Sequence, residues 1–93
     1  MPMAFRVRRF LNPTSTSHTS HVFAEIESSK DGAYRWGTNV IIIADCKRSI
    51  LLEFFLGNAQ ARKLSLRKIN LLIEILTSFR DALAKEIAAI EKQ

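Results

Sequence analysis

Apolar and polar residues alternate through much of the first two-thirds of the chain, and this period of two predicts β-strands. Val22, Ala24 and Ile26 alternate with their neighbours, so a half-exposed strand is expected over residues 22–28. A second strand is expected over residues 34–44, and its end is apolar on both faces, as in a central strand. A third strand is expected over residues 50–56, and residues 61–64 are compatible with a short fourth one.

Turn-forming residues separate these segments. Asp31-Gly32 is the strongest hairpin signal, a short polar break follows at residues 45–49, and Gly57-Asn58 ends the third strand. Residues 1–20 are interpreted as a basic amino-terminal arm and a polar linker. The pattern predicts one α+β domain over residues 21–93, with an antiparallel sheet of about four strands over residues 22–64.

The pattern changes to a helical period after the sheet. From about Leu66 to Glu91 the chain contains no Gly or Pro, and apolar residues recur every seven positions. A helix of roughly 26 residues is about 39 Å long and outreaches a strand of eight residues, which favours a homodimer. An ordinary core helix accounts for the stripe as far as Phe79 and less well beyond it. The predicted dimer interface consists of Leu72, Leu76, Phe79, Leu83, Ile87 and Ile90.

Composition adds a charge asymmetry to this picture. The 93 residues suffice for one domain and carry a net charge of +5. Residues 1–68 contain eleven Lys or Arg against five Asp or Glu, whereas residues 69–93 contain three against four. The basic excess therefore lies in the first two-thirds, where it suits nucleic acid or acidic lipid.

The sequence also gives an expectation about the cellular compartment of the protein. Cys46 is the one cysteine, which excludes a disulfide framework and agrees with a reducing, intracellular compartment, either cytoplasmic or nucleoid-associated. No apolar run approaches a membrane span, and the amino terminus lacks the apolar core of a secretory signal. The arginine-rich amino-terminal segment is also compatible with a transit peptide for import into an organelle.

Basic residues gather where the helix is expected to begin. Ser65 is expected to be the N-cap, which places Arg67 and Lys68 in a first turn that normally favours acidic residues. An incoming phosphate would relieve this charge mismatch. A solvated basic turn is the alternative.

Other basic residues lie beside turns or aromatic rings, a combination that suits single-stranded nucleic acid. Phe5 and Phe10 flank the arginines at residues 6–9, and Trp36 follows Arg35, although core packing also explains a tryptophan on a strand. The predicted nucleic-acid-binding residues are Arg35, Trp36, Lys47, Arg48, Arg62, Lys63, Arg67 and Lys68.

Catalytic chemistry has little support in the sequence. His18 and His21 are the only histidines, and no Gly-rich phosphate loop, HExxH or CxxC spacing occurs. No catalytic residue, metal site, cofactor, small-molecule substrate or membrane partner is therefore predicted.

The layout resembles the transcriptional coactivator positive-cofactor-four family, over about residues 35–83. The stretch Arg62-Lys63-Leu64-Ser65-Leu66 is similar to the family's basic start of the helix, and residues 40–48 are similar to its first strand and basic hairpin. Cys46 differs from the aromatic residue usual in the family. The resemblance, shared by Whirly-type proteins with a ββββα unit, implies a dimer of curved sheets that binds single-stranded DNA.

Two functions follow as expectations. The first is a non-enzymatic homodimer that binds single-stranded DNA or RNA, in the manner of a transcription or replication accessory factor. The alternative is a module for dimerisation or for docking a protein partner through the apolar carboxy-terminal part of the helix.

Overall fold

The computed structural model describes residues 3–12, 20–27, 29–31, 34–36 and 39–92. It consists of two units, Met1–Arg62 and Lys63–Gln93. The first contains the strands, and the second contains most of the helix. The elements are β1 (Met3–Phe10), β2 (Ser20–Glu27), β3 (Ser29–Asp31), β4 (Tyr34–Trp36), β5 (Asn39–Asp45), β6 (Arg48–Glu53) and α1 (Ala59–Glu91).

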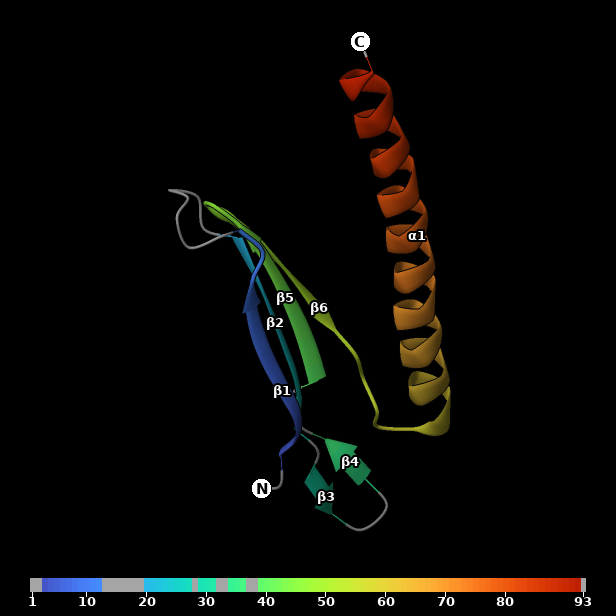
Figure 1. Ribbon diagram of the computed structural model, residues 1–93. Coiled ribbons are helices and arrows are strands. Elements are labelled where there is room, and N and C mark those ends of the chain that lie inside the picture. The colour runs from blue at the N-terminus through green and yellow to red at the C-terminus, as the bar shows by residue number, and fades with distance from the viewer. Residues whose placement is uncertain (1–2, 13–19, 28, 32–33, 37–38, 93) are drawn as a thin grey trace. The chain divides into compact units, whose positions relative to one another are not determined.

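Four antiparallel strands form one sheet in the order β1-β2-β5-β6 (Figure 1). The small hairpin β3-β4 is inserted between β2 and β5 and pairs Asp31 with Tyr34 and Ser29 with Trp36. Together with the single helix after the strands, this arrangement confirms the predicted α+β fold with four antiparallel strands followed by a carboxy-terminal helix.

The identity of the fourth strand differs from the prediction. Residues 61–64 are helical, and the fourth strand is β1, in the segment interpreted as an arm. Phe5 and Val7 lie on one face of β1 and Arg6 and Arg8 on the other, so the segment has the strand period of two. A cross-strand ion pair between Arg6 Nε and Glu25 Oε2, 3.2 Å long, satisfies one of these charges.

The expected strand over residues 34–44 is divided between two sheets. Residues 34–36 form β4 in the small hairpin, and β5 begins at Asn39 in the main sheet. The strand expected over residues 50–56 begins earlier, at Arg48, and ends at Glu53. Gly32 and Ser28 of the predicted turn lie outside the described residues.

The register gives the sheet one strongly apolar face. Residues paired across strands share a face, and the pairs Val22–Ile43 and Ile41–Leu52 continue from one strand to the next. This apolar face consists of Phe5, Val7, Val22, Ala24, Ile26, Ile41, Ile43, Ile50 and Leu52. No hydrophobic side chain of the described residues is buried, so this face is left at least partly open.

A two-residue turn, Cys46-Lys47, joins β5 to β6 between the paired residues Asp45 and Arg48. Cys46 has a φ of 57°, in the left-handed region that favours glycine. On the neighbouring strand, the hydroxyl of Ser20 donates a 2.6 Å hydrogen bond to Asp45 Oδ1, and Ser20 is only 7% exposed. This contact ties the turn end of the sheet together.

Helix α1 begins seven residues before Leu66, the position at which the sequence placed its start. Asn58 is the N-cap, because its Oδ1 accepts a 2.7 Å hydrogen bond from the backbone N–H of Ala61. The prediction that Ser65 caps the helix is wrong, since Ser65 lies inside α1 and is buried. The good helix formers Ala59, Gln60 and Ala61 carry the helix back to the Asn58 cap.

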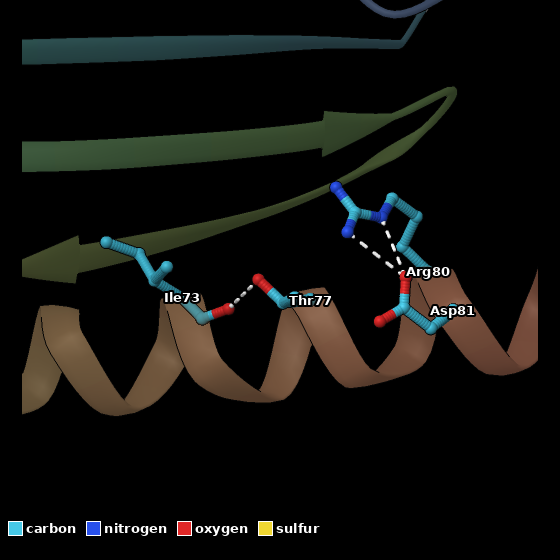
Figure 2. A network of polar contacts seen from close by, with 4 residues as sticks. All are labelled: Ile73, Thr77, Arg80 and Asp81. Atoms are coloured by element: carbon cyan, nitrogen blue, oxygen red, sulfur yellow. Dashed lines mark hydrogen bonds and ion pairs between the residues drawn. The ribbon is translucent and has the colours of Figure 1, made fainter.

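The polar contacts shown for the middle of α1 are local to the helix (Figure 2). Thr77 Oγ1 donates to the backbone carbonyl of Ile73 at 2.8 Å, and Arg80 forms an ion pair with its neighbour Asp81 at 3.1 Å. Both side chains of the ion pair are well exposed, so the pair contributes at most about 1 kcal/mol to stability. The 33-residue helix must gain most of its stabilisation from its apolar side.

Asn58→Ala is expected to lower the free energy of unfolding by about 1 kcal/mol, because one N–H of the first turn loses its side-chain acceptor. Asn58→Asp, which keeps an acceptor oxygen, is the matched control and should retain nearly full stability. Urea unfolding followed by circular dichroism at one fixed protein concentration measures both variants. Equal stability of Asn58→Ala and the unmodified chain would contradict the assignment of Asn58 as the cap.

Candidate nucleic-acid interface

The sheet brings two basic pairs that are distant in sequence to the same end. Phe10 of β1 pairs with His21 of β2, which pairs with Ala44 next to the β5-β6 turn. Arg8 and Arg9 therefore lie at the end of the sheet that also carries Lys47 and Arg48. We call this region the basic end, and it consists of Arg8, Arg9, Phe10, His21, Lys47 and Arg48.

The two ends of the sheet differ in charge. Its four cations lie near one carboxylate of the described residues, Asp45, which already accepts the hydrogen bond from Ser20. At the opposite end the acidic residues Glu25 and Glu53 flank Val40, and Arg6 is bound to Glu25. The sheet is therefore polarised along its strands, with positive charge at the end that holds the Cys46-Lys47 turn.

An exposed aromatic ring accompanies the cations. Phe10 is 61% exposed, the guanidinium of Arg8 lies 5.9 Å from its ring centroid, and the His21 ring meets it edge-on at 6.1 Å. On the same face, Arg6 lies 5.5 Å from the centroid of Phe23. An aromatic ring beside a cation offers a surface on which a nucleic-acid base can stack, together with positive charge for the phosphate backbone.

Adjacent basic residues do not share one face of the sheet. Arg8 and Arg9 point to opposite faces because side chains alternate along a strand, and Arg48 shares the apolar face with Arg9. Lys47 lies at the tip of the turn. The basic end is therefore a rim around the end of the sheet, not a patch on one of its faces.

The predicted nucleic-acid-binding residues of α1 lie on different sides of the helix. Lys63 and Arg67 are four positions apart and share a face, whereas Arg62 and Lys68 lie toward opposite sides of the apolar stripe. The Arg62 Nη1 group donates a 3.0 Å hydrogen bond to the carbonyl of Leu56, before the helix. With the start of α1 at Ala59, Arg67 and Lys68 lie beyond the first turn, so the expected phosphate site at their N–H groups is not formed there.

Arg35 and Trp36 belong to β4 in the small hairpin, where Arg35 pairs with Lys30. The structure thus separates them from the four-stranded sheet that carries Lys47 and Arg48. Four residues of the basic end are absent from the predicted nucleic-acid-binding residues: Arg8, Arg9, Phe10 and His21. Their signal was the alternation of residues 5–8, which identifies a strand and not an arm.

The predicted dimer interface occupies one side of α1. Leu76, Phe79, Leu83, Ile87 and Ile90 are exposed by 46% or more, and Leu72 is half-buried. These residues recur at intervals of three and four, so they form one continuous apolar stripe.

Comparisons with protein-family models, curated proteins and solved structures found no match to this chain. Among the residues that the structure describes, no helix is long and apolar enough to cross a bilayer, and no three His, Cys, Asp or Glu residues are grouped as metal ligands. The functional interpretation therefore rests on the residues of the basic end and of α1.

Proposed function

We propose that this protein is a homodimer that binds single-stranded nucleic acid without catalysing a reaction on it. The observation that carries the proposal is the register, which places Arg8-Arg9 and Lys47-Arg48 at one end of the sheet beside an exposed phenylalanine. Three strand spacings separate β1 from β6, or about 14 Å, which is wide enough for several cations to contact successive phosphates.

The chemistry of the basic end favours a single strand over a duplex. An unpaired base can stack on Phe10, and base–aromatic stacking contributes about 1–3 kcal/mol per base. Bases inside a duplex are already stacked and present only their edges. Phosphates would contact Arg8, Arg9, Lys47 and Arg48.

The test is fluorescence anisotropy with a labelled oligothymidine across a salt series. Each phosphate neutralised on a single strand contributes about −0.7 to the slope of log affinity against log salt, so four contacts predict about −3. A duplex of equal length is the control and should bind more weakly. Absence of binding at low salt, or a slope near zero, would contradict the proposal.

A second candidate function is favoured by a different observation, the exposure of apolar side chains on both α1 and the sheet. Ile50 is 62% exposed and Leu51 is 52% exposed on β6, and Ile90 of α1 is 58% exposed. Such surfaces are typical of protein interfaces. A stable complex with another polypeptide, together with indifference to nucleic acid, would favour a docking module.

A further inference from the structure

The apolar stripe of α1 follows a seven-residue repeat that is interrupted by two polar residues. One set of positions holds Ile69, Leu76, Leu83 and Ile90, and the other holds Ser65, Leu72, Phe79 and Glu86. We call these eight positions the seam. Glu86 is the one charged residue among the eight, and it lies exposed in the last third of the helix.

The length of α1 argues for a second helix against the seam. At about 1.5 Å per residue, its 33 residues extend for about 50 Å, while eight residues of a strand extend for about 26 Å. A strand of this sheet therefore matches only about half of the length of α1. A helix from a second copy of the chain has the same length and the same repeat.

Charge decides the relative direction of the two helices. In a parallel pair in register, Glu86 would face Glu86 of the other copy, and like charges would meet inside an apolar seam. In an antiparallel pair, Leu72 lies opposite Leu83 and Leu76 lies opposite Phe79 of the other copy. The same register places Glu86 opposite Ile69, beside Lys68.

The rest of α1 agrees with the antiparallel arrangement. Arg62, Lys63, Arg67 and Lys68 supply four positive charges near its start, whereas residues 81–92 near its end carry three Asp or Glu against two Lys. Antiparallel packing keeps the two basic starts apart and brings each of them against the slightly negative end of the other helix, and it also opposes the two helix dipoles favourably.

We infer that two copies of this chain pair through an antiparallel α1–α1 interface in which Glu86 of each copy lies beside Lys68 of the other. The inference rests on the proposed homodimer and adds its orientation and its polar contact. Lys68 flanks the seam one residue before Ile69, so its long side chain has the reach for that carboxylate. The pair selects one register and one direction, which is a known role of polar residues in helix seams.

The experiment uses the full chain with Cys46→Gly, which suits the positive φ of the turn, and one spin label at a new cysteine. The two label sites, Ser78→Cys and Ala88→Cys, both lie outside the seam. In the antiparallel register Ser78 lies within about one residue of the two-fold axis, whereas the two copies of Ala88 are offset by roughly 30 Å along the helix. Pulsed electron spin resonance should give a distance for Ala88 that exceeds that for Ser78 by more than about 10 Å.

The outcomes separate the two proposals. Two similar, short distances would mean a parallel pair and would overturn this inference while leaving the homodimer intact. A monomeric chain in sedimentation equilibrium would overturn the homodimer and this inference together. Nucleic-acid binding by the basic end is measured separately by anisotropy, so its failure is not confused with either result.

Charge exchange supplies an independent check. Glu86→Lys and Lys68→Glu are each expected to raise the dimer dissociation constant about tenfold or more, because like charges then meet at the seam. The double variant should return to within about threefold of the unmodified chain. Glu74→Lys changes the charge equally on the outer face of α1 and is the control. If the double variant lost as much dimer affinity as the two single variants combined, the Glu86–Lys68 contact would be overturned.

Discussion

Replacement of Leu76 by aspartate is expected to convert the dimer into monomers. Leu76 lies at the centre of the apolar stripe and is 52% exposed, so within one chain the change is readily tolerated. In the proposed helix pair its side chain is enclosed by the other copy, and a carboxylate there has no partner. Burial of an unpaired charge costs several kcal/mol, so the dissociation constant should rise by about 100-fold or more. Sedimentation equilibrium measures it.

Leu71→Asp provides the matched control for this prediction. Leu71 is 44% exposed on the same helix, but it lies away from the seam, so the same chemical change should leave the dimer intact. Circular dichroism should show equal helix content in both variants. Dimers of Leu76→Asp with unchanged affinity, or equal dissociation of both variants, would contradict an interface centred on the seam.

The helix and two of the strands could be predicted from the sequence because their signals are local. The spacing of apolar residues from Ile69 to Ile90 is enough to predict the helix. An aliphatic run followed by a polar break predicts the β5-β6 hairpin. The start of α1 was harder to predict, since both Asn58 and Ser65 are good caps. The hydrogen bond to Ala61 shows that the chain uses the earlier one.

Strand β1 was missed because arginines dominate its short sequence. Its pairing with β2 across the segment at residues 11–19 is a non-local contact, and no local signal specifies it. The ion pair of Arg6 with Glu25 and the position of Arg6 near Phe23 show how β2 accommodates these charges. The alternation of Phe5 and Val7 with arginines is the one local sign of a strand in this segment.

The basic end could not be assembled from sequence for the same reason. Two adjacent arginines such as Arg8-Arg9 suggest a local concentration of positive charge. Because side chains alternate along a strand, however, the two arginines point to opposite faces of the sheet. Arg8 and Lys47 are brought to one end only by the successive pairings of β1 with β2, β2 with β5 and β5 with β6. The candidate site is thus a product of register, which depends on contacts distant in sequence.

The largest loss of nucleic-acid affinity is expected from charge reversal at both sides of the basic end, in the double variant Arg8→Glu/Lys47→Glu. Two phosphate contacts are replaced by repulsion, so affinity for the oligothymidine should fall about 100-fold or more at fixed low salt. The salt slope should become shallower by about 1.4, because two fewer phosphates are neutralised. The anisotropy titrations described above measure both quantities.

Two further variants identify which property of the basic end is responsible. Lys85→Glu/Lys92→Glu changes the net charge by the same amount but lies on exposed positions outside the basic end and the seam, so it should lower affinity only severalfold. Phe10→Ala removes the stacking surface without removing charge, and it should weaken binding while leaving the salt slope unchanged. Equal losses in the two charge-reversal variants would show that net charge alone drives binding. A full effect confined to Arg8→Glu/Lys47→Glu, together with an unchanged slope for Phe10→Ala, would assign phosphate contacts to the cations and base stacking to the ring.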